Sequence, residues 1–468
     1  MCRNINYSIL ILILPLLLFL GGCAGKTGQP GFASVRQSIA DRIGSDLHWH
    51  AEPVPDEQAA SEVERMLGNP LTADTAAQIA LLNNRGIQAL YHELEISHAD
   101  VIQAGLLRNP IFDASVLFPL DGGNTEINLG IRLPLLEAFL VPARKRVGES
   151  RFGETETHVI ARVMDLAHET RAAFFQAQAA QQHAALMEKR VLAVELAFDF
   201  ARRLRQAGNI TELELHKQRD HYEKARLELR RAESSRFGSR ERLNRLMGLW
   251  GERIDWEIEG ELPGIPAEEL ENGPDRIDLE SRVVEASLDL ESARQRIVTA
   301  GHELGIQNAT ALVPKLELGA EAERNEDWVM GPTLSFPIPL FDQGQARRAR
   351  GRAHLRRAQE SYTALAIHVR SHAREAYEQY ASARDIVHYY QHVILPLRER
   401  IVNETELQYH AMRVGPLEML LAKEQEIAAG IEYVHAMKDY WIARARIEQM
   451  LSGRVPGDFN GMQPHARP

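Results

Sequence analysis

The 468-residue chain carries a net charge of −11, is 25% charged and only 6% aromatic, and contains two cysteines. A negatively charged chain has no electrostatic attraction for nucleic acid, so we expect no nucleic-acid partner. Two cysteines exclude a disulfide-rich scaffold, and the shortage of aromatic residues favours long helices over a large globular core.

The chain begins with an apolar segment that is typical of an export signal. Residues 9–20 are apolar and follow a single positive charge, Arg3, but they are fewer than the ~20 residues of a membrane-spanning helix. The letters LGGC that end at Cys23 resemble the bacterial lipobox, in which the cysteine is acylated and the preceding peptide is removed. We predict a signal peptide over 1–22, a covalent lipid on Cys23 and a lipidated N-terminal linker over 23–70. The alternative is an ordinary signal cleaved nearby.

Two heptad patterns in the same phase indicate a tandem duplication. Small or apolar residues alternate at spacings of four and three from Ala173 to Phe198, and again from Ala376 to Ile401. Each residue of the second run lies 203 positions after its counterpart. Two runs at one offset indicate halves that share a structure.

Each half is predicted to contain a helical hairpin. Long helices span residues 143–207 and 342–413, and after glycine-containing turns the chain returns as helices over 210–247 and 416–451. At 1.5 Å per residue, each long helix is on the order of 100 Å long. Pro396 has no partner in the first half and predicts a kink or break there. The heptads alone also fit a periplasmic structural coiled coil.

Four segments alternate with a period of two and are predicted to be strands, over residues 111–118, 126–133, 315–322 and 328–336. Each has one apolar face and one polar face. Their lengths suit tilted transmembrane strands of about 9 to 11 residues, although a soluble sheet would show the same alternation. Four strands cannot close a barrel, and open edges do not occur in hydrocarbon, so a sheet in the membrane requires several chains.

The lipobox, the tandem halves, the strand pair in each half and the long hairpins together resemble the TolC-type outer-membrane factors, the outer membrane efflux protein family. The resemblance covers roughly residues 70–451. "TADTAAQIALLNNRGIQALYHELEISHADVIQAGLLRNP" and "VPARKRV" are similar to the family's opening helix and strand exit. The C-terminal segment that begins "ELQYHAMRVGPLEML" is most similar to the heavy-metal efflux (CzcC-like) lipoprotein branch.

The resemblance implies a mainly α fold with transmembrane β. In such a fold a tandem-repeat protomer with long coiled-coil hairpins and four strands forms a homotrimer, with a 12-stranded β-barrel in the outer membrane and a periplasmic α-barrel. The implied function is a passive conduit from periplasm to exterior, opened by an inner-membrane pump and its periplasmic adaptor protein. We expect heavy-metal cations as cargo. Multidrug efflux or type I secretion is the alternative within the fold, and a periplasmic coiled-coil scaffold or adaptor lipoprotein is the alternative of another class.

The remaining boundaries follow from the duplication. The first repeat is predicted over 71–248, an inter-repeat linker over 249–275, the second repeat over 276–451 and a disordered tail over 452–468.

The resemblance assigns adaptor docking to the two hairpin tips. Val414, Gly415 and Pro416 match the family's short tip turn, and Gly208 and Asn209 occupy the equivalent place in the first half. Glycine would also be needed there for turn geometry alone, since it lets antiparallel helices reverse within a few residues.

The resemblance also assigns a pore gate to Glu418. Family members constrict the pore entrance with acidic side chains just after the second tip; Glu418 falls on one such position, whereas Leu421 replaces the other acid. Three Glu418 side chains in a narrow pore would attract cations. The alternative is a solvated glutamate on a helix surface.

Two histidine pairs have the spacing of a shared metal site, His368 with His372 and His388 with His392. Neither pair lies on the heptad seam, and only Glu375 offers a third ligand at helical spacing. We therefore predict exposed helix residues and no metal site. No nucleophile elbow, phosphate loop or HExxH motif occurs, so we expect no enzymatic activity and no cofactor besides the lipid.

Overall fold

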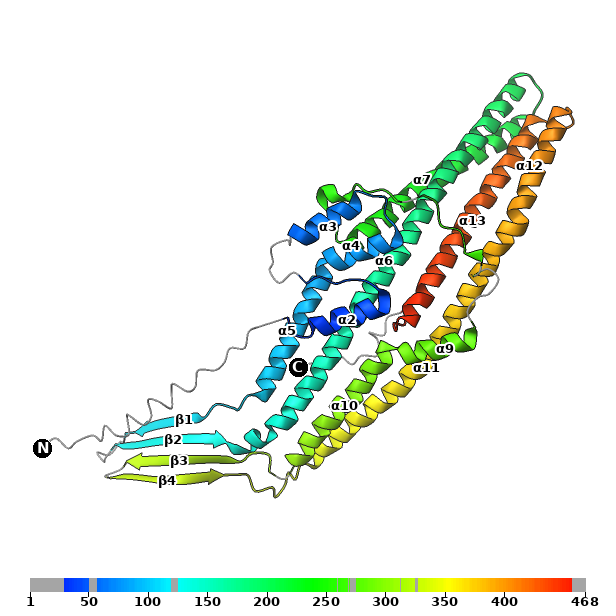
Figure 1. Cartoon of the computed structure of the whole chain (residues 1–468). Coiled ribbons are helices and arrows are strands. Elements are labelled where there is room, and N and C mark those ends of the chain that lie inside the picture. The colour runs from blue at the N-terminus through cyan, green and yellow to red at the C-terminus, as the bar shows by residue number, and fades with distance from the viewer. Residues whose placement is uncertain are drawn as a thin grey trace.

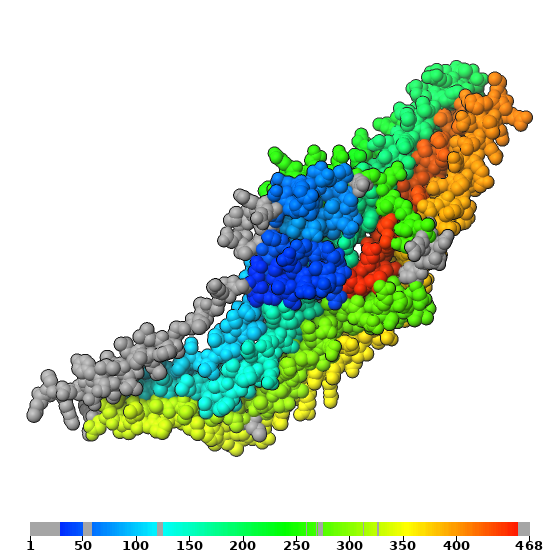
Figure 2. All heavy atoms as spheres, in the orientation of Figure 1, coloured from blue at the N-terminus to red at the C-terminus, as the bar shows by residue number. Residues whose placement is uncertain are grey.

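The computed structural model describes residues 29–49, 57–118, 125–258, 260–267, 269, 275–311, 313–324 and 327–456. The predicted signal peptide and Cys23 lie outside these residues. Figure 1 shows an elongated molecule with a small sheet at one end and two helical hairpins that point to the other end. In Figure 2 the N-terminal helices form a bulge about midway along its length.

The helices of the first half are α2 (Phe32–Ile43), α3 (Glu57–Leu67), α4 (Ala73–Asn83), α5 (Arg85–Gly105), α6 (Leu135–Gln206) and α7 (Glu212–Met247). A short 3-10 turn, η1 (Gly251–Ile254), follows. The second half contains α9 (Arg276–Ala286), α10 (Leu288–Ala309), α11 (Gln345–Tyr389), the π-helical turn η2 (Tyr390–Ile394), α12 (Leu395–His410) and α13 (Pro416–Leu451).

The helix caps repeat with the offset of the heptad seam, and they confirm the duplication. Thr72 and Asp275 cap α4 and α9, and Asn84 and Ser287 cap α5 and α10, each pair 203 residues apart. In all four caps a side-chain oxygen accepts a hydrogen bond from a backbone N–H of the first helical turn, which satisfies donors that the helix itself leaves open.

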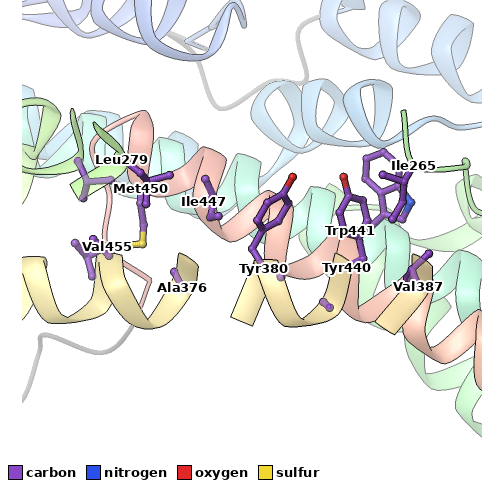
Figure 3. Close-up of a cluster of buried hydrophobic side chains, with 14 of the residues drawn as sticks. Ile265, Leu279, Ala376, Tyr380, Val387, Tyr440, Trp441, Ile447, Met450 and Val455 are labelled. Atoms are coloured by element: carbon purple, nitrogen blue, oxygen red, sulfur yellow. The ribbon is translucent and has the colours of Figure 1, made fainter. Parts of the chain in front are cut away.

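The heptad seams lie in the core of the helical part. Ala173, Ala177 and Ala184 of α6 are buried, as are Ala376, Tyr380, Ala383 and Val387 of α11. Figure 3 shows the second of these clusters, in which Tyr380 packs with Tyr440 and Trp441 of α13. Alanine-rich seams let long helices approach closely along their whole length.

The predicted break at Pro396 is confirmed. The π-helical turn Tyr390–Ile394 lies immediately before Pro396, which is in the first turn of α12. Proline has no N–H and its ring clashes with the preceding turn. The helix accommodates it with a π-helical turn, in which each hydrogen bond spans one more residue than in an α-helix. Beyond this turn the seam rotates outward, and Leu397 and Ile401 are 45% and 37% exposed.

The start of the first long helix differs from the prediction. The prediction placed Pro142 just before the helix, whereas α6 begins at Leu135 and contains Pro142 in its interior. Pro142 lies in the third turn from the N-terminus and still costs one backbone hydrogen bond. The helix begins immediately after β2, which ends at Pro134. The backbone N–H of Leu136 donates a hydrogen bond to the carbonyl of Leu316.

The sheet has the order β1 (Ile111–Leu117), β2 (Glu126–Pro134), β3 (Glu317–Arg324), β4 (Trp328–Ser335), and every neighbouring pair is antiparallel. β3 is shifted by two residues from its predicted span. Its first residue, Glu317, pairs with Pro134, where β2 ends, so 315–316 have no strand to pair with.

Parts of the predicted N-terminal linker and of the predicted disordered tail are packed against the core. The predicted linker 23–70 contains α2 and α3, and Val35 and Ile39 of α2 are fully buried beside α6. The first residues of the predicted disordered tail are ordered too: Arg454 forms ion pairs with Asp165 and Asp289, and Val455 is buried. Composition did not reveal these contacts because their partners lie far away in the sequence.

Candidate functional site

One face of the sheet is apolar across all four strands. Paired residues share a face, so the register places Phe112 beside Ile131 and Ala320, and Leu133 beside Leu318 and Leu334. These side chains are accessible: Phe112 is 68% exposed and Leu334 is 60% exposed. A continuous exposed apolar surface is rare in a soluble monomer and marks contact with lipid or another chain.

The opposite face of the sheet is polar and acidic. The residues of this face that carry charge are Asp113, Glu126, Arg132, Glu317, Glu321 and Glu323. Nη2 of Arg132 lies 2.7 Å from Oδ2 of Asp113 across the β1–β2 pair, and Nη1 lies 3.9 Å from Oε2 of Glu317. Five carboxylates against one guanidinium leave this face with excess negative charge.

Glycine at position 319 makes room for the polar side chains of its neighbours. A Cβ there would lie 2.5 Å from the carbonyl oxygen of Ile131 and 2.8 Å from Oγ1 of Thr333. Neither a backbone carbonyl nor a strand-anchored threonine can move away cheaply. Gly319 therefore lets β2 and β4 lie close to β3, one on each side, without a clash.

The first hairpin tip closes with a Schellman motif. The backbone N–H of Asn209 donates to the carbonyl of Leu204 (2.9 Å), and that of Gly208 donates to Arg205 (3.0 Å). Gly208 has φ +76, a conformation that costs glycine nothing. The side chain of Thr211 then caps α7.

The second tip uses the same motif, but not with the predicted glycine. Arg413 donates to the carbonyl of Gln408 and Met412 to that of Tyr409, both at 2.9 Å, and Met412 has φ +58. Gly415 is extended, with φ −85, and precedes Pro416 at the start of α13. Gly415 is thus not the reversing residue: Met412 holds the left-handed position at a cost of roughly 1–2 kcal/mol. It is also 93% exposed.

Glu418 lies in the first turn of α13, where its charge is favourable to the helix dipole. Its side chain is exposed and makes no ion pair with any residue that the structure describes. Leu421, one turn further, is half exposed. In one protomer these residues are solvated, and a ring of Glu418 needs further copies of the chain.

An ion-pair cluster that the sequence did not reveal joins the two hairpins. Arg190 of α6 contacts Glu228 of α7 at 2.5 Å and the buried Glu424 of α13 at 2.9 Å. Because these residues lie off the seam and far apart in sequence, no periodicity marks them.

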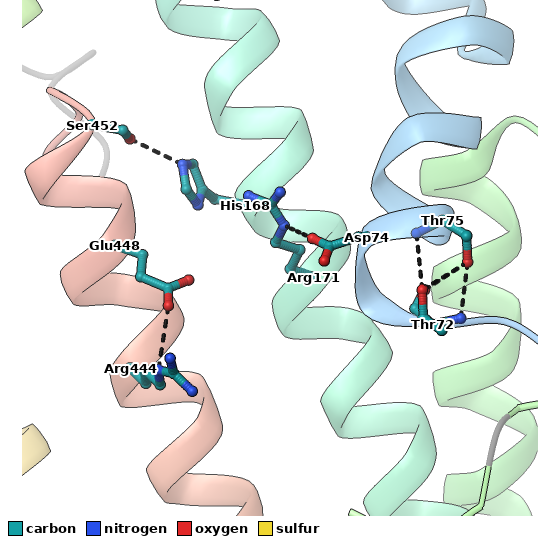
Figure 4. A network of polar contacts seen from close by, with 8 residues as sticks. All are labelled: Thr72, Asp74, Thr75, His168, Arg171, Arg444, Glu448 and Ser452. Carbon is teal, nitrogen blue, oxygen red and sulfur yellow. Dashed lines mark hydrogen bonds and ion pairs between the residues drawn. The ribbon is translucent and has the colours of Figure 1, made fainter. Parts of the chain in front are cut away.

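Polar contacts also hold the middle of the molecule together (Figure 4). Arg171 of α6 contacts Asp74 of α4 at 3.0 Å, and Nε2 of His168 lies 3.0 Å from Oγ of Ser452. Burial lowers the pKa of His168 to about 4, with the positive charge of Arg171 as a smaller cause. His168 is therefore neutral in the folded chain near pH 7.

No described helix is both long and apolar enough to cross a membrane. Likewise, the described part of the chain has no group of three or more His, Cys, Asp or Glu residues able to hold a metal ion.

Comparison with known proteins finds a family and several structures to which the chain is similar. The sequence model of the family described as "Outer membrane efflux protein" matches residues 76–249. The cobalt-zinc-cadmium resistance protein CzcC of Cupriavidus metallidurans is 25% identical over 407 residues, which cover 83% of this chain and 91% of that protein. Part of the chain thus matches the outer membrane efflux protein family, and most of it is similar to CzcC.

Solved structures share the fold of this chain. A membrane protein from Pseudomonas aeruginosa has a TM-score of 0.66 at 17% identity, covering 87% of this chain and 97% of its own. CusC has a TM-score of 0.59 at 15% identity, covering 88% of this chain and 99% of its own. The predicted resemblance to this family and the predicted mainly helical fold with a small sheet are confirmed.

Proposed function

We propose that the protein is the channel component of a tripartite efflux system, a passive conduit for heavy-metal cations from the periplasm to the exterior. The observation that carries this proposal is the open sheet with one continuous apolar face and one acidic face. Such a sheet is stable in a membrane only when its edges are paired. Its function therefore depends on neighbouring copies.

The strand order permits closure with further copies of the chain. β1 and β4 are the two edges and run antiparallel to each other, so β4 of one protomer can pair with β1 of the next without changing the pattern. Three protomers would give a 12-stranded barrel with the apolar face toward lipid and the acidic face toward the lumen. The alternative of another class is a periplasmic scaffold. Such a protein would lie in water, where a large exposed apolar sheet is unfavourable.

The cargo is argued from charge and from relatedness. The acidic face would raise the local concentration of cations in the barrel. CzcC, which is similar over most of both chains, is named for resistance to cobalt, zinc and cadmium. Multidrug efflux or type I secretion remains the alternative cargo for the same fold.

The proposed partners are assigned to the two hairpin tips and to the N-terminus. We assign adaptor docking to the exposed tips, Gly208–Asn209 and Val414–Pro416, and gating to Glu418. The covalent lipid on Cys23 would tether the N-terminus to the outer membrane. An inner-membrane pump would supply the energy for export through this passive conduit.

Deletion of the gene tests the cargo. We expect reduced tolerance to cobalt, zinc or cadmium and unchanged tolerance to dyes and detergents, with recovery when the wild-type gene is returned. Lost tolerance to dyes with unchanged metal tolerance would reject heavy-metal cations and favour multidrug efflux.

A further inference from the structure

We propose that His368 and His372, on α11, form a bidentate binding site for a divalent transition-metal ion. The proposal concerns a site on the protein itself and does not depend on which solute the channel exports.

The geometry of the two rings carries the proposal. Nε2 of His368 lies 3.3 Å from Nε2 of His372, and the ring centroids are 4.2 Å apart. Two imidazole nitrogens bound at about 2.0–2.1 Å to one tetrahedral metal ion are themselves about 3.3 Å apart. The two nitrogens are thus already at the separation that a shared metal ion requires, and binding would need little movement of either side chain.

A carboxylate lies near the second nitrogen of the second ring. Oε2 of Glu375 lies 3.7 Å from Nδ1 of His372, on the side of the ring opposite His368. Metal-binding histidines commonly have a carboxylate at their second nitrogen, which favours the tautomer whose other nitrogen faces the metal. Glu375 is thus suited to orient His372 rather than to bind the metal.

The pair can be reached from solvent. The side chain of His372 is 35% exposed. On α11 the pair continues, at helical spacing, the row of Ser361 and Leu365, which line a cleft of about 650 Å³ between α6, α10 and α11. The described residues provide no third protein ligand, so water would fill the remaining positions and the ion would exchange readily.

Metal binding at this pair needs no co-reactant, because the proton between the two rings is kept by one of them. In the metal-free pair, one Nε2 donates a hydrogen bond to the other. When a metal binds, both Nε2 atoms offer lone pairs, and the proton that lay between them moves to Nδ1 of its own ring.

The second histidine pair, His388 at the end of α11 and His392 in η2, serves as a control with the same sequence spacing. His388 and His392 have the same spacing and the same centroid separation of 4.2 Å. Their rings stack with only 23° between planes, and Nδ1 of His392 bonds to the backbone oxygen of His388 at 3.0 Å. No hydrogen bond joins their ring nitrogens, so this pair does not converge on one point.

The test is Cu²⁺ titration of the full-length protein in detergent, without a histidine tag, followed by electron paramagnetic resonance. Cu²⁺ is the appropriate probe because it binds nitrogen sites most tightly among the divalent first-row ions. We expect one site per chain with two equatorial nitrogens. His368→Gln and His372→Gln should each leave one nitrogen and weaken binding at least ~10-fold, while His388→Gln should leave the site unchanged.

Glu375→Gln provides a second variant that keeps both ligands. It should weaken binding less than loss of a histidine and retain the two-nitrogen signal. Binding that is unaffected by His368→Gln, or that falls equally with His388→Gln, would overturn the proposal and identify the pair as hydrogen-bonded histidines only. Unchanged helical circular dichroism of each variant ensures that folding is not the cause.

Discussion

At the scale of single residues, the left-handed position at a hairpin tip is not always held by glycine. Gly208 takes the left-handed conformation at the first tip, and Met412 takes it at the second, although Gly415 is three residues away. Sequence reasoning chose Gly415 because only glycine adopts that conformation without strain. The left-handed residue is instead Met412, because α12 ends at His410, and no sequence pattern marks that helix end.

His168 gives a residue-scale prediction about pH. Burial lowers its pKa in the folded chain from 6.5 to about 4. Between these two values the unfolded chain binds more protons than the folded chain, so the free energy of unfolding decreases as pH falls from 6.5 toward 4. His168→Gln should reduce this loss of stability, measured as the difference in melting temperature between pH 7 and pH 5 by circular dichroism.

The control for this variant is His216→Gln, which changes a histidine that is 63% exposed. It should leave the pH dependence as in the wild-type protein. If His168→Gln and the wild-type protein lose the same stability between pH 7 and pH 5, protonation of His168 does not limit acid stability.

At the scale of elements, the sequence predicted what depends on local periodicity. Alternation located all four strands, the heptads located both hairpins, and Pro396 marked the π-helical turn. It failed where distant contacts decide the structure. The packing of α2 on α6, the ion pairs of Arg454 and the contact of Arg190 with Glu424 join residues separated by more than 100 positions.

The two faces of β2 give an element-scale prediction. Ile131 lies on the apolar face and Asn128 on the polar face of the same strand. A lysine on a lipid-facing position near the middle of a membrane costs about 2–4 kcal/mol, whereas a lumen-facing one is tolerated. Ile131→Lys should therefore reduce the amount of trimer recovered from outer membranes, and Asn128→Lys should not.

The readout is the heat-sensitive trimer band in unboiled gel samples, compared with total protein. Equal recovery of the two variants, or greater loss with Asn128→Lys, would mean that the apolar face does not meet lipid.

At the scale of the whole molecule, one protomer is incomplete. Its sheet has two unpaired edges and an exposed apolar face, while its helical hairpins extend away from the sheet to tips that carry the exposed Met412. Three copies would satisfy the edges, bury the apolar face in lipid and collect the acidic faces around one lumen. We therefore expect the functional channel to be a trimer.

Conductance of the purified full-length protein in planar bilayers tests that claim most directly. Under a salt gradient, we predict stepwise conductance with a reversal potential that indicates preference for cations, because the lumen would carry an excess of carboxylates. A protein that remains monomeric and produces no conductance, or a channel that prefers anions, would contradict a trimeric channel with an acidic lumen.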